Sequence, residues 1–138
     1  MAESLNHINY VKRIVEYVKD IPTAFISHCL LADLPDSPER PTATLDGYIP
    51  DVLYKDAQTI IIGEAKTIRD VENDHTERQI DSYIEEVRCH KGTRHIVICS
   101  NTLSFSHIKN MLVRKKMREN ISDINFHILD NICKVAVI

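Results

Sequence analysis

The sequence contains little glycine and proline and no long hydrophobic run. Its 138 residues include only 3 Gly and 5 Pro, with 43% hydrophobic and 27% charged residues, as in an ordinary globular protein. No apolar run approaches the roughly 20 residues of a membrane helix. The first ten residues, MAESLNHINY, lack the basic start and apolar core of a signal peptide. We therefore expect one soluble, intracellular (cytoplasmic) domain over residues 1–138, with no membrane partner.

The cysteine and histidine patterns do not match the common disulfide or zinc-binding motifs. The chain has no C-x-x-C pair and no H-x-x-x-H or H-E-x-x-H pattern. The apolar surroundings of Cys99 and Cys133 predict free, buried thiols rather than disulfides or a zinc site.

A strong excess of positive charge is also absent. The net charge of −3 argues against a protein that coats nucleic acid by bulk charge. A local basic segment, KNMLVRKKMR, begins at residue 109. Its candidate phosphate contacts are Lys109, Arg114, Lys115 and Lys116. Cations favoured by the dipole at the end of a helix explain the same residues.

Apolar periodicity predicts three helices and at least four strands. The expected helices span residues 4–20 with Ser4 as N-cap, residues 72–90, and a segment from Ser104 or Ser106 to about Asn120. The expected strands are 44–54, 59–66, 94–100 and 123–129, with a possible last strand in 132–138 and a loop at 33–41.

The resulting order, α-β-β-α-β-α-β, predicts an α/β fold. The first two strands read as an antiparallel hairpin, although Pro50 lacks a ladder donor and should leave its strand bulged, partly paired or at an edge. Strands that alternate with helices later in the chain predict parallel neighbours. We therefore expect a mixed β-sheet flanked by helices.

Polar side chains interrupt the two most hydrophobic strands, in DGYIPDVLYKDAQTIIIGEAKT (residues 46–67). Because strand side chains alternate between faces, Glu64 and Lys66 project to one side. The hairpin allows Asp51 to lie opposite or diagonal to Glu64. Two close carboxylates favour a cation between them, and the backbone carbonyl of Ala65 is a further candidate ligand for Mg²⁺. With Lys66 beside a metal-bound water or phosphate, the pattern indicates metal-assisted phosphodiester hydrolysis.

The same residues carry a resemblance to a known family. Pro50-Asp51, followed after twelve residues by Glu64-Ala65-Lys66, resembles the signature of the PD-(D/E)XK nuclease superfamily. The element order also resembles that superfamily's restriction-endonuclease-like core. The resemblance implies an Mg²⁺- or Mn²⁺-dependent endonuclease acting on DNA, with branched or structured DNA among the candidate substrates and a homodimer as one candidate assembly.

Two further residues of this resemblance lie on the helix that follows. Gln79 and Tyr83 are four residues apart and share a helix face. They resemble the Gln and Tyr pattern of Holliday-junction-resolvase-like and virus-type replication-repair nucleases, in which Gln79 would position water or phosphate. Tyr83 also continues an apolar stripe, which favours core packing. An acidic metal ligand from the first helix is expected too, with Glu16 as the candidate and Glu3 as a weaker one.

Plainer interpretations exist for each residue. Asp51 suits a turn after a proline. Glu64 and Lys66 can form an exposed charge pair. Glu16 and Gln79 can be ordinary surface residues of their helices. At the level of function, the alternatives are a non-catalytic module that binds nucleic acid or a protein, and an endoribonuclease.

Overall fold

The computed structural model describes residues 5–67 and 74–138. The helices are α1 (Leu5–Val18), α2 (Asp74–Arg88) and α3 (Thr102–Arg118), with a short 3₁₀ turn η1 at Ser27–Cys29. The strands are β1 (Leu30–Ala32), β2 (Val52–Lys55), β3 (Thr59–Ala65), β4 (Thr93–Ser100), β5 (Asn125–Asp130) and β6 (Val135–Val137).

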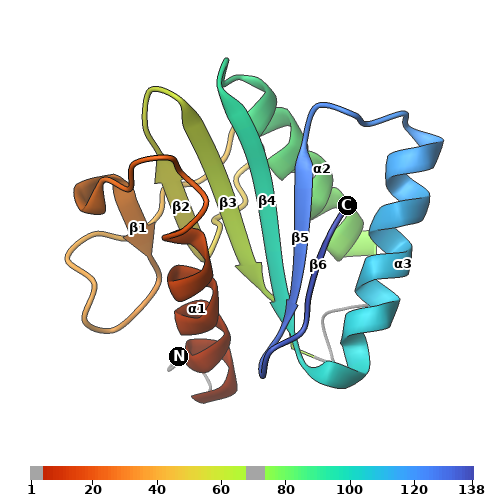
Figure 1. Cartoon of the computed structure of the whole chain (residues 1–138), viewed down its shortest axis with the longest axis horizontal. Coiled ribbons are helices and arrows are strands. Elements are labelled where there is room, and N and C mark those ends of the chain that lie inside the picture. Colours follow the sequence, from red (N-terminus) through yellow and green to blue (C-terminus); the bar gives the residue numbers. More distant parts are fainter. Residues whose placement is uncertain (1–4, 68–73) are drawn as a thin grey trace.

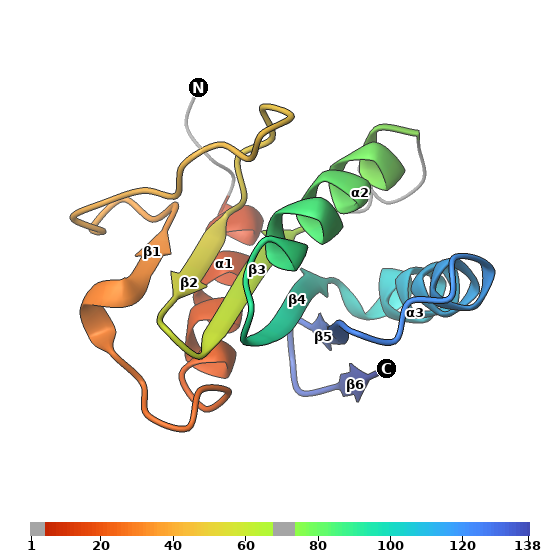
Figure 2. The same ribbon diagram turned by 90° about the horizontal axis from the view of Figure 1, so that it is seen from above.

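The six strands form one mixed sheet in the order β1-β2-β3-β4-β5-β6. β1, β2 and β3 are antiparallel neighbours, β3, β4 and β5 are parallel, and β6 returns antiparallel to β5. α1 lies on one face, while α2 and α3 lie on the other (Figures 1 and 2). The predicted α/β class and mixed sheet flanked by helices are confirmed.

Alternation along the strands builds one apolar layer on each face. In β3, Ile61 packs in the layer that includes α1, whereas Ile60 and Ile62 pack in the layer that includes α2 and α3. Side chains that follow Ile62 on the same face therefore point toward α2. This alternation positions the polar end of β3.

Several element boundaries differ from the sequence prediction. The strand expected at 44–54 begins only at Val52, because residues 44–48 form their own turn and Pro50 cannot donate to the ladder. β1 was not predicted at all. α3 begins before Ser104, because the Asn101 side chain accepts a hydrogen bond from the Ser104 amide and acts as N-cap. The possible last strand is present as β6. The predicted cap at Ser4 and helix start at residue 72 lie outside the described residues.

The cysteines are free, as predicted, but only Cys99 is buried. Cys133 is exposed, because it lies in the turn between β5 and β6 rather than in a strand. Within the described ranges, no helix is both long and apolar enough to cross a lipid bilayer.

α1 is anchored to the sheet by a chain of hydrogen-bonded side chains. The Tyr17 hydroxyl is hydrogen-bonded to His127 Nδ1 of β5 at 2.7 Å, and His127 Nε2 is hydrogen-bonded to His95 Nδ1 of β4 at 2.9 Å. Burial, with a smaller effect of His95, lowers the pKa of His127 to about 4. The His127 ring is therefore neutral near pH 7, and α1 is held at a fixed position across the sheet.

α1 approaches the sheet closely at Gly63. A Cβ on Gly63 would lie 2.7 Å from Ile14 Cγ2 and 3.0 Å from Val52 Cβ. We expect Gly63→Ala to lower the free energy of unfolding by about 1–3 kcal/mol, because a packed core accommodates an added methyl group poorly. Denaturant unfolding measures this difference, and an unchanged free energy would contradict the close approach.

Candidate active site

The register of the β2–β3 hairpin brings Asp51 and Glu64 together. Val52 pairs with Gly63, and the ladder continues one step further, with the Asp51 amide donating to the Gly63 carbonyl at 3.0 Å. Asp51 therefore stands opposite Glu64, and its Oδ2 accepts a hydrogen bond from the Ala65 amide at 2.9 Å. Both carboxyl residues are only 7% exposed. The predicted convergence of the two carboxyl groups is thus present.

α2 covers the Glu64 side chain with two polar groups. The Tyr83 hydroxyl donates a short hydrogen bond to Glu64 Oε1, and Gln79 Nε2 donates to the same oxygen at 3.2 Å. The Lys66 ammonium donates to Gln79 Oε1. Gln79 therefore links Lys66 to Glu64. All four side chains are buried.

Local sequence explains why these groups meet. Glu64 and Lys66 continue the row of Ile60 and Ile62 on the face of β3 toward α2. On α2, the four-residue spacing of Gln79 and Tyr83 places both on one side of the helix, next to the apolar residues that pack on the sheet. Tyr83 packs in the core, as predicted, and its hydroxyl reaches the site as well.

The two carboxyl groups have opposite electrostatic environments. Burial raises the pKa of Glu64 well above its usual range, and the neighbouring Asp51 raises it further. Burial opposes ionisation of Asp51 too, but hydrogen bonds with His7, Glu64 and the Ala65 amide outweigh it and lower the pKa of Asp51. Without a cation, Glu64 is therefore the carboxyl group of the pair that holds a proton more readily, and Asp51 is the one that ionises more readily.

A histidine that the sequence prediction missed lies against Asp51. His7 Nε2 on α1 is 3.3 Å from Asp51 Oδ1. Ligand atoms of His7, Asp33 and Asp51 all lie within 4.8 Å of one another. Asp33 is brought there by its amide, which donates to the Asp51 carbonyl at 2.8 Å, and its carboxylate also pairs with Arg40. Imidazole and carboxylate oxygens are both metal-ligand types.

The predicted acidic ligand on α1, Glu16, is elsewhere. Its side chain is 73% exposed and pairs with Lys19 at 3.1 Å. Glu16 lies nine positions from His7 on the helix, which corresponds to about 13.5 Å along the axis. His7 reaches the site because it extends the buried stripe of Tyr10, Val11 and Ile14 by one turn toward the N-terminus. That spacing was the available sequence signal.

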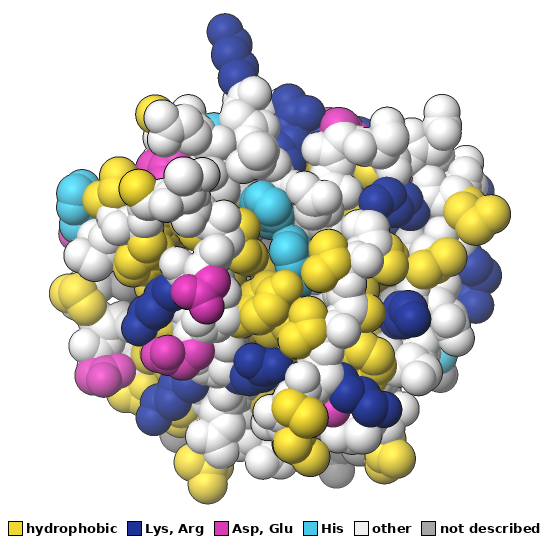
Figure 3. All heavy atoms as spheres, in the orientation of Figure 1, with side chains coloured by type: hydrophobic (Ala, Val, Ile, Leu, Met, Phe, Trp, Pro, Cys, Tyr) yellow, Lys and Arg dark blue, Asp and Glu magenta, His cyan; other side chains and the backbone are white. Residues whose placement is uncertain are grey.

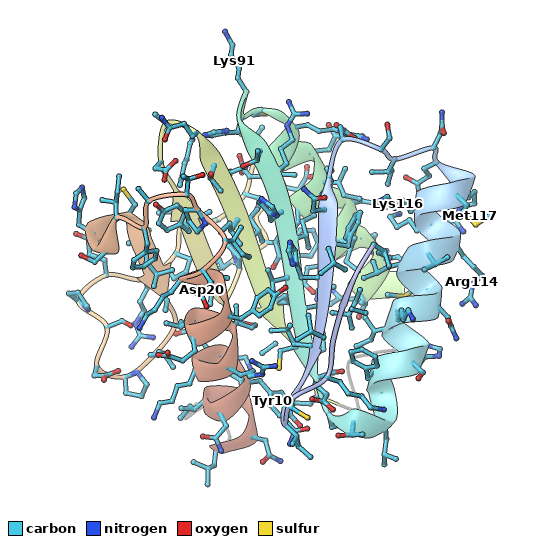
Figure 4. All side chains as sticks on the ribbon, in the orientation of Figure 1. Tyr10, Asp20, Lys91, Arg114, Lys116 and Met117 are labelled. Carbon is cyan, nitrogen blue, oxygen red and sulfur yellow. The ribbon has the colours of Figure 1, made fainter. Side chains whose placement is uncertain are left out.

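The basic residues of α3 divide into exposed and internal groups. Arg114 projects away from the sheet, whereas Lys116 points back toward it, with its ammonium 5.9 Å from the Phe126 ring centroid (Figure 4). Lys109 is half-buried. Lys and Arg side chains are visible on the side of the molecule where α3 lies (Figure 3).

Lys115 differs from its neighbours on α3. It is only 3% exposed and lies 2.5 Å from Asp81 Oδ1 and 2.7 Å from Glu119 Oε2. The pair with Asp81 joins α3 to α2, and Glu119 caps α3, so Lys115 has a structural role rather than the phosphate contact predicted for it.

The chain was compared with known proteins. No family model, curated protein sequence or solved structure matches it.

Proposed function

We propose that the protein is a metal-dependent endonuclease of the PD-(D/E)XK type, which hydrolyses phosphodiester bonds in DNA with Mg²⁺ or Mn²⁺. The observation that carries the proposal is the burial of Asp51 and Glu64 side by side, with Lys66 on the same face of β3. The restriction-endonuclease-like core is part of the proposal. The antiparallel hairpin β2–β3 and the parallel connection β3–α2–β4 support it, because they place the motif at the carboxyl end of β3.

The donor set fits a hard divalent cation. Asp51 and Glu64 cannot both ionise in a buried site unless positive charge lies between them, and oxygen ligands of this kind suit Mg²⁺ or Mn²⁺. The backbone carbonyl of Ala65 is the proposed additional ligand. When bound, the cation supplies Lewis acidity toward a phosphate oxygen and lowers the pKa of its water.

Neighbouring side chains orient the Glu64 carboxyl group and the Lys66 ammonium group and maintain the charge of Asp51. Tyr83 and Gln79 fix the Glu64 carboxyl group through their hydrogen bonds to Oε1. Gln79 also holds the Lys66 ammonium in the site, where its charge stabilises negative charge that develops on the phosphate. Asp51 keeps its charge through the Ala65 amide and His7.

Cleavage assays test this proposal. We expect Mg²⁺- or Mn²⁺-dependent cleavage of duplex, branched or single-stranded DNA, and loss of cleavage in Asp51→Ala and Glu64→Ala. Cleavage that survives both substitutions would refute the assignment. Binding without cleavage would favour the non-catalytic module, and cleavage of RNA alone would favour the endoribonuclease.

The position of His7 predicts a preference among metals. Imidazole suits transition metals, whereas Mg²⁺ prefers oxygen ligands. We expect His7→Ala to weaken Mn²⁺ binding about 10-fold or more relative to Mg²⁺ binding, as measured by calorimetry with each metal. Glu16→Ala, on the exposed side of the same helix, should leave both affinities unchanged. Equal losses for the two metals in His7→Ala would mean that His7 acts only on the charge of Asp51.

A further inference from the structure

Residues 44–49, which we call the apolar loop, expose large hydrophobic side chains directly before Asp51 and β2. Leu45 is 89% exposed and Ile49 is 60% exposed. Single exposed apolar residues are common, but these two lie within six residues of each other and of Asp51. Ile49 is two residues from Asp51, so their Cα atoms are at most about 7 Å apart.

The apolar loop is held in a defined conformation. The Thr44 amide donates to the Tyr48 carbonyl at 2.8 Å, and the Gly47 amide donates to the Thr44 carbonyl at 2.9 Å. Gly47 has φ +88°, which favours glycine at this turn. The Thr44 hydroxyl is hydrogen-bonded to Ser82 of α2 at 2.6 Å, in the interior. Leu45 and Ile49 are thus presented from an anchored turn.

The apolar loop lies on the same side of the sheet as α2 (Figure 2). There the half-buried Tyr48 ring contacts the His75 ring of α2 edge to face, with centroids 5.5 Å apart. Ser82, which anchors the loop, directly precedes Tyr83, the hydrogen-bond donor to Glu64. The loop and the proposed metal ligands therefore share one side of the protein.

A pocket of about 270 Å³ lies beside the apolar loop. Pro50, Leu53 and Ile62 are among the apolar residues that line it, and Thr42 and Ala43 lie at its loop side. Pro50 directly precedes Asp51, and Ile62 precedes Glu64 by two positions on the same face of β3, so one end of the pocket lies next to the carboxyl pair. The other end is lined by Lys55, Ile60 and Glu86 and extends away from the pair. Its size is slightly below that of pockets for drug-sized ligands and suits a smaller flat group such as one nucleobase.

The exposed apolar side chains near Asp51 affect which DNA the proposed nuclease would bind. If the scissile phosphate binds at Asp51 and Glu64, the adjoining nucleotide lies against the apolar loop and its pocket. Apolar side chains gain nothing from phosphates, but they can contact the faces of bases. In an intact duplex those faces are stacked on one another, and separating them costs a few kcal/mol. A strand with unpaired bases avoids that cost.

We propose that the apolar loop and its pocket receive an unstacked base next to the scissile phosphodiester, so that the protein selects DNA forks, flaps and single strands over intact duplex. The inference rests on the proposed function for the position of the phosphate. Its test, however, measures binding and is read independently of cleavage.

The test compares a DNA fork with a duplex of the same sequence, each carrying 2-aminopurine at the branch position. Binding is measured by fluorescence anisotropy with Ca²⁺, which takes oxygen ligands, in place of Mg²⁺. We expect the wild-type protein to bind the fork at least 10-fold more tightly, with a rise in 2-aminopurine fluorescence as the base leaves the stack. Each base contact of this type contributes about 1–3 kcal/mol, or roughly 5- to 150-fold in affinity.

Three variants locate the effect. In Leu45→Ser/Ile49→Ser, and separately in Ala43→Phe, which fills the pocket from an exposed position, we expect the fork preference to fall to about 2-fold. Met117→Ser is the matched control, because Met117 is an exposed apolar residue near the far end of α3 and points away from the sheet (Figure 4). It should keep the full preference.

The outcomes separate this inference from the nuclease proposal. Equal binding of fork and duplex by the wild type, no binding of either DNA, or an equal loss in Met117→Ser would overturn the inference. A fork preference that depends on the loop, in a protein that cuts neither DNA with Mg²⁺ or Mn²⁺, would support the inference and refute catalysis. Cleavage of both DNAs at equal rates, unchanged by the loop variants, would support catalysis and refute the inference.

Discussion

Glu64→Gln should abolish divalent-metal binding and, at the same time, stabilise the metal-free protein. The buried Glu64 carboxyl group has a raised pKa because of desolvation and the nearby charge of Asp51. The folded protein therefore holds a proton that the unfolded chain releases above about pH 4.5, so stability falls as the pH rises from that value toward the folded pKa. A glutamine at this position keeps an oxygen that accepts from Tyr83 and Gln79. Because its amide does not ionise, it does not lose stability as the pH rises.

We expect Glu64→Gln to raise the free energy of unfolding in EDTA at neutral pH by about 1 kcal/mol or more. Substitutions that remove a destabilising group from a functional site commonly stabilise a protein by this amount. Thermal unfolding against pH should be flatter than in the wild type. Glu85→Gln is the control, because Glu85 is exposed on α2 and should change little. A variant that is no more stable than the wild type, or that still binds Mn²⁺, would contradict the assignment of Glu64.

The same titration should make the proposed metal binding by the wild type depend on pH. The proposed cation needs the Glu64 carboxylate, so below the raised pKa of Glu64 its binding should displace a proton. Apparent affinity should therefore rise with pH up to the folded pKa of Glu64. Calorimetry in buffers of different ionisation enthalpy should detect the released proton.

Lys66→Met should separate catalysis from metal binding. The Lys66 ammonium is buried and held by Gln79 in the site. Removing a charge that stabilises the transition state typically lowers the rate about 10²–10³-fold. Metal affinity should fall much less, because Lys66 is not a ligand, although its positive charge favours ionisation of Glu64.

Single-turnover cleavage rates and calorimetric metal affinities measure the two effects of Lys66→Met separately. Lys91→Met provides the control, since Lys91 extends into solvent from the turn between α2 and β4 (Figure 4). Unchanged cleavage in Lys66→Met, or an equal loss in Lys91→Met, would exclude the catalytic role of Lys66.

Short-range periodicity made the centre of the site predictable. The two-residue repeat of β3 fixed the common face of Glu64 and Lys66, and the hairpin left few registers for Asp51. The four-residue spacing of Gln79 and Tyr83 likewise placed both on one side of α2. Each of these inferences depends on residues within one element or one tight connection.

Residues that act across long sequence separations were harder to assign. His7 and Asp51 are 44 positions apart, and only the packing of α1 on the sheet brings them together. Lys115 is internal because Asp81 on another helix offsets the cost of its burial. β1 has only three residues, too few to show an alternating pattern, and is formed by pairing with β2.

A crystal soaked with Mn²⁺ tests the shared cation of Asp51 and Glu64 most directly. We predict an anomalous difference peak about 2.0–2.6 Å from carboxylate oxygens of both residues, and its absence in crystals of Glu64→Gln. A peak bound only by His7 and Asp33, or no peak near Asp51 in crystals that hold Mn²⁺ elsewhere, would contradict the proposed metal site.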